Sequence, residues 1–405
     1  MSNTLLTIDM VTREALRVAH ESCSFISTTD RQYDDSFGKT GAKIGTALRV
    51  RKPNAYTRTT GSRVMDVQDQ EEANGTITVA TQDHVDMRFN SVELALSLDD
   101  FSKRYIEPAV KVLVSGIESD YLAFATKATY NVAGTAGTAI TSLVAPGAAR
   151  AKLNQGLAPK DNMRAIQMDS VTMGGLVNGV AAYFNPSNAI SDQYREGLVA
   201  RTAMADYYEN ERVWTLTNSN DVTGTTDAAA QVTDGGSTID MADTITNAAV
   251  GSVFTVAGVY ACHPETKAAY PHLQQFVVTA NSSGLCTVSP STILTGARKN
   301  VVSSTGATLA TTDFNSKTLT FIGAASTSYV MPLMYHKEAF QFVTADLPLM
   351  DDAAKCVRRV QDGLSMRVWQ ASDIRNDEQL MRIDILYGMA ALRAEWACRM
   401  VGAAS

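Results

Sequence analysis

The spacing of apolar residues near the start of the chain predicts an amphipathic helix. Within residues 7–24, Val11, Ala15 and Val18 recur three or four positions apart, which is typical of a helix with one buried face. The next residues, up to about 44, are polar and contain glycine. They are expected to form a loop or an arm.

A longer helix is predicted from Ser97. Ser97 and Asp100 have the spacing of a capping box, and apolar residues then recur at helical spacing as far as about Tyr130. Pro108 lies in the third turn of this pattern, where it either kinks the helix or marks its true start. We expect a helical spine over residues 97–130.

Between the two helices the period changes from three or four to two. Apolar and polar residues alternate around residues 48–51, 76–79 and 85–89, as they do in half-buried strands. Residues 53–75, between these strands, contain few large apolar groups and cannot build a core of their own. The pattern predicts a long hairpin that extends outward and packs against something else.

The rest of the chain mixes helical and strand patterns. Residues 131–160 are rich in Ala, Gly and Thr and predict a loop with one short strand, followed by a strand near 165–168 and a helix over 170–183. From 217 to 329, short apolar alternations are separated by turn residues, which is typical of a small all-β barrel or sandwich. Further strands are expected near 335–343, 364–370 and 381–387. The fold class predicted is α+β.

Composition bounds the class of protein. The chain has 405 residues, 45% hydrophobic and 19% charged, with a formal net charge of −7, so it has the composition of a globular protein of two or three domains. An acidic balance does not favour a general nucleic-acid binder. An odd number of cysteines, five, makes a disulfide framework unlikely. We expect neither a signal peptide nor a membrane-spanning segment.

Charges are sorted along the predicted hairpin. Residues 49–63 contain only basic charges, and residues 64–86 contain acidic residues and no Lys or Arg. The residues that we predict to contact other subunits are Arg49, Arg51, Lys52, Arg58 and Arg63 on the basic side and Asp66, Asp69, Glu71 and Glu72 on the acidic side. Asp83 and Asp86 continue the acidic run. Solvated surface charge is the alternative interpretation.

No recognisable catalytic pattern is present. The chain lacks the phosphate-loop, dinucleotide, zinc-protease and hydrolase-elbow motifs. Cys262, His263, His272 and Cys286 are the one group of metal-ligand residue types, and their spacing matches no zinc pattern. We predict a protein that is not an enzyme and uses no cofactor or metal.

Four stretches carry a resemblance to a known family. They are YFNPSNAISDQYREGLVARTAMADYYENERV (Tyr183–Val213), VGSVFTVAGVYACHPETK (Val250–Lys267), FVTADLPLM (Phe342–Met350) and RIDILYGMAALRAEWACRMVG (Arg382–Gly402). Through them the chain resembles the major capsid, or coat, proteins of tailed bacteriophages. The likeness is strongest to the short-tailed-phage coat family that carries an inserted domain.

The resemblance implies a Hong Kong 97-type capsid fold. The implied parts are an N-terminal arm at 1–44, an E-loop at 45–92, a P-domain with the spine helix at 93–132, an A-domain at 133–216 and 330–347, an inserted β-domain at 217–329, and returning P-domain strands at 348–405. In this family the E-loop lies across an adjacent subunit, where sorted charges would meet complementary ones.

The implied function is a structural, non-catalytic one. Copies would assemble as pentamers and hexamers into an icosahedral shell in the virion, after synthesis in the host bacterial cytoplasm. The implied partners are a scaffolding protein, a portal protein and a decoration protein, with double-stranded DNA enclosed without sequence-specific binding and no membrane. A cellular nanocompartment (encapsulin-like) shell is the first alternative, and an enzyme with a carbohydrate-binding β-domain is the second.

Overall fold

The computed structural model describes most of the chain as two compact units. The described residues are 8–34, 47–61, 65, 67, 74–90, 102–180, 205–241, 244–349, 355–361, 364–373, 375 and 378–404. The first unit comprises Met1–Val50, Asn74–Tyr121 and Phe340–Leu392, and the second comprises Arg51–Ala73, Leu122–Ala339 and Arg393–Ser405. The predicted capping box at Ser97 and Asp100 lies outside the described residues.

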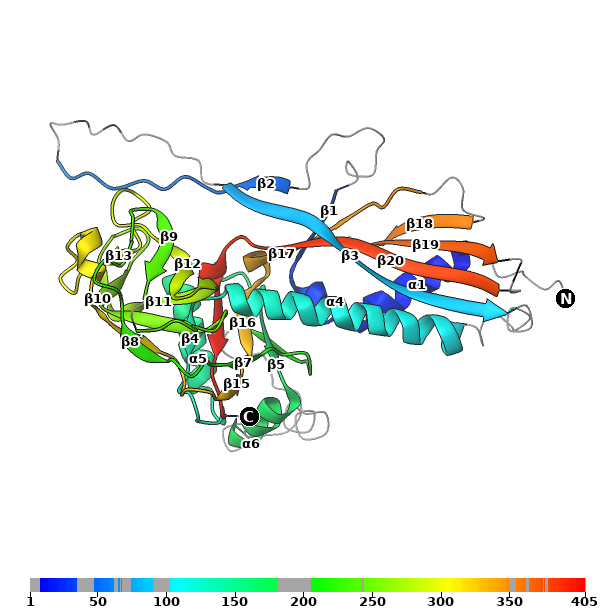
Figure 1. The fold of residues 1–405 in the computed structure, drawn as a ribbon, viewed down its shortest axis with the longest axis horizontal. Helices are drawn as coiled ribbons and strands as arrows, with labels where there is room; N and C mark the ends of the chain where they lie inside the picture. Colours follow the sequence, from blue (N-terminus) through cyan, green and yellow to red (C-terminus); the bar gives the residue numbers. More distant parts are fainter. Residues whose placement is uncertain are drawn as a thin grey trace. The chain divides into compact units, whose positions relative to one another are not determined.

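The first unit is built on a long antiparallel pair of strands, β3 (Asn74–Asn90) and β20 (Glu378–Ala391) (Figure 1). β19 (Leu364–Asp373) and β17 (Phe340–Ala345) share the other edge of β20. The sheet is completed by β18 (Lys355–Gln361), β1 (Asp30–Asp34) and β2 (Ala47–Arg51). The predicted strands around 48–51, 76–79, 85–89, 364–370 and 381–387 are confirmed.

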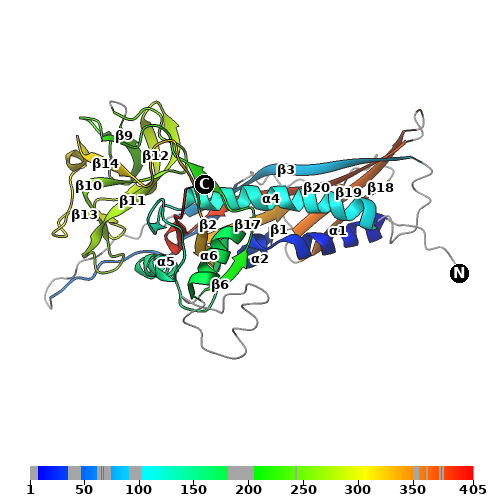
Figure 2. The same ribbon diagram turned by 90° about the horizontal axis from the view of Figure 1, so that it is seen from below.

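Two helices cover one face of this sheet. α1 (Ile8–Ser22) and the first turns of α4 (Glu107–Ala128) lie side by side beneath the strands (Figure 2). Ile106, Val110, Leu113, Ile117 and Tyr121 of the predicted stripe are all buried, because their spacing places them on one face of the helix. A short π-helix, η2 (Ser102–Ile106), precedes α4, so Pro108 marks the start of the α-helix and not a kink.

The second unit contains a five-stranded sheet in the order β4-β21-β16-β5-β6. Their bounds are β4 (Val132–Ala133), β21 (Ala397–Met400), β16 (Leu333–His336), β5 (Arg164–Met168) and β6 (Asp206–Glu209). α6 (Ser170–Val180) follows β5, as predicted. Two further strands, β7 (Thr215–Thr217) and β15 (Ser328–Val330), pair with each other.

One element of this unit corrects the sequence prediction. Residues 131–160 were expected to be a loop with one short strand, but they also contain α5 (Val144–Gln155). The helix buries only Pro146, Ala149 and Leu153, which is a narrow and weakly apolar stripe. Since small residues make most of its buried face, the apolar period that signals a helix is faint in this stretch.

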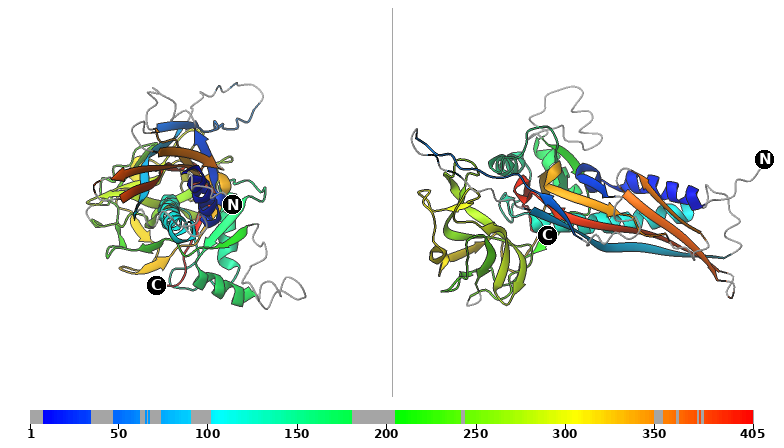
Figure 3. Two further views of the ribbon diagram at one scale, coloured as in Figure 1. Left: turned by 90° about the vertical axis from the view of Figure 1, so that its right-hand side faces the viewer. Right: turned by 90° about the horizontal axis from the view of Figure 1, so that it is seen from above.

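The rest of the second unit is an all-β assembly. Its sheet runs in the order β8-β14-β10-β11-β12-β9, with β13 paired to β10. The bounds are β8 (Thr223–Thr225), β9 (Gly236–Asp240), β10 (Val253–Cys262), β11 (Ala269–Ser282), β12 (Leu285–Thr292), β13 (Val301–Val302) and β14 (Thr318–Phe321). The strands curl around a shared interior (Figure 3).

Backbone hydrogen bonds join the two ends of this curled sheet. The amide of Asp227, just after β8, donates to the carbonyl of Asp240 at the end of β9 (2.9 Å), and the amide of Asp240 donates to Ala230 (2.9 Å). Phe254 lies between Phe276 and Phe321 in the core, with ring centroids 5.9 and 5.2 Å away. The helices and strands together confirm the predicted α+β class.

Candidate assembly surface

The basic half of the hairpin lies on and after β2. Arg49, Arg51 and Arg58 are exposed and Lys52 is half-buried. Residues 52–61 have no regular secondary structure. Of the other predicted contact residues, Arg63, Asp66, Asp69, Glu71 and Glu72 lie outside the described part of the chain.

Large apolar side chains on the hairpin are strongly exposed. Met65 is 86% exposed, Val67 77% and Tyr56 59%. Single exposed apolar residues are common on protein surfaces, but these three lie within twelve residues on an extended segment without a core. Such a segment offers apolar area that a partner can cover. Only the charged residues of this segment were predicted as contacts, although these apolar side chains stand isolated in a polar run of the sequence.

The last two acids of the charge-sorted segment are engaged inside the first unit. The Tyr387 hydroxyl donates to Asp83 Oδ2 (2.8 Å). Asp86 lies 3.1 Å from His84 Nδ1 and 3.8 Å from Arg382 Nε. Burial, and then the neighbouring Asp83 carboxylate, raise the pKa of Tyr387 well above its usual value. These two acids therefore hold β3 to β20 within one chain.

A buried ion pair lies on the face of the sheet opposite α1 and α4. Arg367 Nε donates to Asp384 Oδ1 (3.0 Å) and its NH2 reaches Oδ2, which forms a bidentate pair with both side chains almost fully buried. Gln82 also donates to Asp384 Oδ2 (2.9 Å). Arg367 NH1 donates to the Pro348 carbonyl (2.6 Å), and the guanidinium packs on the Trp369 ring at 5.3 Å. The charges of this group are satisfied by residues of the same unit.

A buried carboxylate fixes the N-terminal segment to α4. Glu118 accepts hydrogen bonds from the Ser24 amide (2.8 Å), the Ser24 hydroxyl (3.0 Å) and the Phe25 amide. These donors stand at the start of the short helix α2 (Phe25–Thr28), whose first amides lack partners within the helix. Phe25 also packs on Tyr121, with ring centroids 4.7 Å apart.

The second unit buries an arginine without a carboxylate partner among the described contacts. Arg399 Nε and NH2 donate to the Thr129 carbonyl, and NH1 donates to the Gly251 carbonyl (2.7 Å). Burial lowers the pKa of Arg399 to about 9, so the side chain still carries its charge at neutral pH. Arg399 thereby links the end of α4, strand β21 and the turn before β10.

Gln275 makes a second link in this region. Its side-chain amide donates to the Val132 carbonyl (3.1 Å), and its carbonyl accepts from the Val132 amide (3.0 Å). These two hydrogen bonds replace those that a neighbouring strand would make with Val132 of β4. Val132 also belongs to an apolar cluster that includes Val253 and Val277.

The described residues contain no group of three or more His, Cys, Asp or Glu side chains that could hold a metal ion. Cys286 is buried in the β core, whereas His263 and His272 each contact the Tyr270 ring, with ring centroids 5.7 and 5.4 Å away. Among the helices described, none is both long enough and apolar enough to cross a membrane.

Comparison with known proteins identifies the class. The model of the family described as "P22 coat protein - gene protein 5" matches residues 211–402. No curated protein sequence matches the chain at a significant level. The prediction of a tailed-phage major capsid protein, a structural component of the phage, is confirmed by the family match. The matched residues, 211–402, are just under half of the 405-residue chain.

Several solved structures from phages match most of the chain but are distant from it in sequence. One from bacteriophage PhiM1, described as a mature capsid, is 10% identical, with 94% of this chain and 87% of that chain covered and a TM-score of 0.47. One from Mycobacterium phage Che8 is 8% identical, with 91% and 88% covered and a TM-score of 0.45. The capsid of cyanophage P-SCSP1u is 11% identical, with 95% and 90% covered and a TM-score of 0.44.

Proposed function

We propose that copies of this chain assemble into the closed icosahedral shell that encloses the double-stranded DNA of a tailed phage. The observation that carries the proposal is the match of residues 211–402 to the phage coat family. A match to a phage coat protein also favours the phage shell over the encapsulin-like alternative. Pentamers and hexamers in the virion, synthesis in the host cytoplasm, and scaffolding, portal and decoration proteins as partners belong to the same proposal.

The proposed domain assignment follows the Hong Kong 97-type arrangement expected from the sequence. The hairpin at 45–92 is the E-loop, the sheet with α1 and α4 contains the P-domain, and the five-stranded sheet of the second unit contains the A-domain. The curled β sheet between residues 223 and 321 is the inserted domain. The two-way hydrogen bond of Gln275 to Val132 supports an insert that is attached to its own A-domain.

The proposed assembly contacts use the hairpin charges. Arg49, Arg51 and Arg58 are exposed, as residues that meet another subunit must be before assembly. Each exposed ion pair contributes only about 0–1 kcal/mol. Weak individual contacts allow a misplaced subunit to dissociate, whereas many contacts per shell make the closed particle stable.

Electron microscopy of the purified chain tests this proposal. At about 0.15 M salt the Debye length is about 8 Å, and at about 1 M it is about 3 Å, so exposed charge contacts are strongly screened in the second condition. We expect closed shells, tubes or spirals at the lower salt concentration and fewer of them at the higher one. Monomers under both conditions, and also after co-expression with the neighbouring phage genes, would contradict the proposal.

A further inference from the structure

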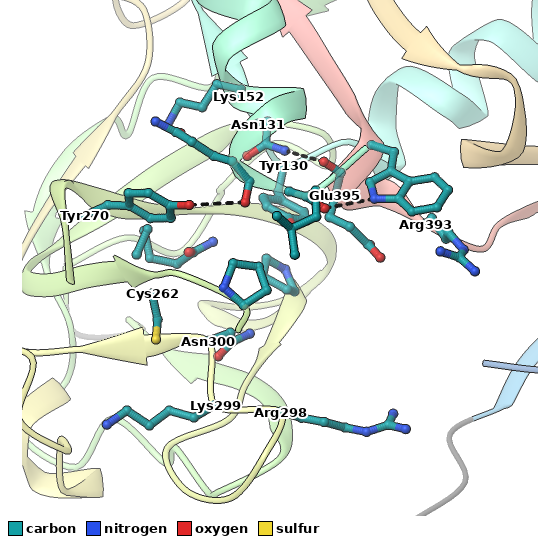
Figure 4. Close-up of a pocket in the computed structure, with 18 of the residues that line it drawn as sticks. Tyr130, Asn131, Lys152, Cys262, Tyr270, Arg298, Lys299, Asn300, Arg393 and Glu395 are labelled. Atoms are coloured by element: carbon teal, nitrogen blue, oxygen red, sulfur yellow. Dashed lines mark hydrogen bonds between the residues drawn. The ribbon is translucent and has the colours of Figure 1, made fainter. Parts of the chain in front are cut away.

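A cavity of about 520 Å³ lies within the second unit (Figure 4). Its walls come from α5 and the turn after it, from β10 and β11 of the curled sheet, and from the segment before β21. Lys52, Pro53 and Ala55 also line it. Small-molecule sites in proteins are concave and have volumes of about 300–1,000 Å³, so this cavity has room for a ligand of ordinary size.

Four cationic side chains line the cavity without a carboxylate partner. They are Lys152, Lys267, Lys299 and Arg393, and none of them forms an ion pair within the described part of the chain. In the view of Figure 4, Lys152 and Lys299 lie on opposite sides of the open space. Glu395 is the only acid among the described residues of the lining. A concave surface with an excess of one charge attracts ligands of the opposite charge.

Neutral groups hold two of these cations in place. Lys267 Nζ donates to the carbonyls of Pro264 (2.6 Å) and Lys299 (3.3 Å). The guanidinium of Arg393 lies over the Trp396 ring, 4.0 Å from its centroid. Contacts of this kind orient a cation without cancelling its charge, so the charge is left for a ligand.

Aromatic side chains give the cavity a second kind of recognition. Tyr270 and His272 lie two residues apart on β11, and both line the cavity. Their rings are stacked, with an angle of 20° between the planes and centroids 5.4 Å apart. Both side chains are half-buried. Aromatic rings at a binding surface stack with the bases of nucleotides, whatever the base.

A buried acceptor at the cavity has no partner. Gln155 is the last residue of α5, and its side-chain oxygen Oε1 is buried without a hydrogen bond from any described residue. Buried polar groups are almost always hydrogen-bonded, so this atom requires an explanation. The Tyr270 hydroxyl donates to the backbone carbonyl of the same Gln155 (3.3 Å), which joins this wall to the aromatic pair. An N–H or O–H group of a ligand would satisfy Oε1.

Burial makes the positive charge of the lining costly. Desolvation lowers the pKa of Lys152, and desolvation together with the charge of Lys299 lowers the pKa of Lys267. An anion in the cavity favours the protonated form of both lysines. Binding of an anion and retention of the positive charge therefore stabilise each other.

We infer that the cavity binds a nucleoside phosphate, with the phosphates against the lysines and the base against Tyr270 and His272. The Gln155 oxygen then accepts a hydrogen bond from the base or the sugar. Inorganic phosphate would use the cations but not the rings, and an uncharged aromatic compound would use the rings but not the cations. The nucleotide is a bound ligand and not a cofactor of a reaction, and the inference is independent of the proposed shell function.

Titration calorimetry on the unassembled full-length subunit tests the inference. The probes are ATP, tripolyphosphate, which lacks the base, and adenosine, which lacks the phosphates. We expect ATP to bind at least about fivefold more tightly than either, because only ATP combines charge with stacking. Equal binding of ATP and tripolyphosphate would make the cavity a site for any anion and would overturn the inference, as would the lack of ATP binding.

Substitutions separate the two kinds of recognition. Lys152→Gln with Lys299→Gln should weaken the binding of ATP and tripolyphosphate alike, by about tenfold or more. Tyr270→Leu should weaken ATP binding and leave tripolyphosphate binding unchanged, whereas Tyr270→Phe keeps the ring and should bind ATP as the wild type does. Lys160→Gln, at an exposed lysine outside the cavity, is the charge control. ATP binding that is unchanged in the double lysine variant or in Tyr270→Leu would overturn the inference.

A free nucleotide and a nucleotide within a DNA strand share this chemistry, and a single-stranded oligodeoxyadenylate of about ten nucleotides distinguishes them. We expect it to bind less tightly than ATP, because only ATP presents three phosphates next to one base. Tighter binding of the oligonucleotide would assign the cavity to a DNA strand and overturn the inference. Photolabelling with 8-azido-ATP should modify peptides that contain Tyr270 or His272, and labelling confined to other parts of the chain would also overturn it.

Discussion

Each of the two units buries an arginine, and the two arginines are held in different ways. In the first unit, Arg367 and Asp384 form a bidentate pair inside the sheet, and Gln82 adds a further hydrogen bond to the same carboxylate. In the second unit, the contacts described for buried Arg399 are with the Thr129 and Gly251 carbonyl oxygens. A carboxylate partner neutralises a buried arginine, so loss of that partner leaves an uncompensated charge. An arginine held by carbonyl oxygens keeps its charge and joins backbone segments through the geometry of its planar fork.

The largest expected effect comes from breaking the internal pair of the first unit. Asp384→Ala leaves the buried Arg367 guanidinium without its counter-charge, which should lower the free energy of unfolding by about 3–5 kcal/mol. Urea denaturation of the unassembled subunit measures this. Asp86→Ala is the matched control, because that carboxylate is exposed and faces the same strand; it should cost at most about 1 kcal/mol. Similar losses for the two variants would contradict the comparison.

The next effect concerns the unmatched arginine of the second unit. Arg399→Met retains much of the apolar stem but leaves the Thr129 and Gly251 carbonyls without their donor, at a cost of about 2–4 kcal/mol. Arg399→Lys keeps the charge but not the planar fork that reaches both carbonyls, so it should rescue only part of the loss. Full rescue by lysine would show that charge alone, and not the fork geometry, holds these segments together.

A glycine next to the same arginine gives a smaller, sharper test. Gly251 has φ +94°, and a Cβ there would lie 2.7 Å from the Trp214 ring. Gly251→Ala should therefore cost about 2–3 kcal/mol, from backbone strain and overpacking together. Gly258 has a similar φ of +85° but open space around it, so Gly258→Ala should cost only about 1 kcal/mol. Thermal or urea denaturation of the two variants measures the loss of stability. The difference between them gives the cost of overpacking, and the loss in Gly258→Ala gives the cost of backbone strain.

The smallest expected effect is a pH dependence at His272 in the second unit. Burial and the nearby charge of Lys152 lower the pKa of His272 from its ordinary value of 6.5 to about 4 in the folded chain. Between these two values the unfolded chain binds a proton that the folded chain does not, so stability is complete above pH 6.5 and falls as the pH drops towards 4. His272→Gln should flatten this part of the stability curve. His84→Gln, at an exposed position on β3, serves as the control.

Local patterns in the sequence predicted much of the fold. α1 and α4 carry apolar stripes at helical spacing, and β3, β19 and β20 alternate at a period of two, so each element could be located from its own residues. α5 could not be, since small residues form most of its buried face. The two ends of the curled β sheet are joined by backbone hydrogen bonds of Asp240. Backbone hydrogen bonds do not depend on the order of apolar and polar side chains, so this closure could not be predicted from the sequence pattern.

The candidate site was predicted only in part, for a similar reason. The sorted charges of the hairpin are neighbours in sequence and were visible at once. A cavity of about 520 Å³ in the second unit brings together Lys52, Lys152 and Lys299. These residues lie about one hundred or more positions apart and share no motif, so their proximity could not be predicted from the sequence. Asp83 and Asp86 were grouped with the acidic segment by sequence proximity, yet their positions on β3 direct them to Tyr387 and Arg382 of the same chain.

A cryo-electron microscopy map of the assembled particle tests the central claim most directly, because it shows which surfaces of neighbouring subunits meet. We predict a closed icosahedral shell in which Arg49, Arg51 and Arg58 of one subunit lie against a neighbouring subunit. A closed shell in which these three arginines face solvent, or contact only their own subunit, would contradict the proposed assembly contacts.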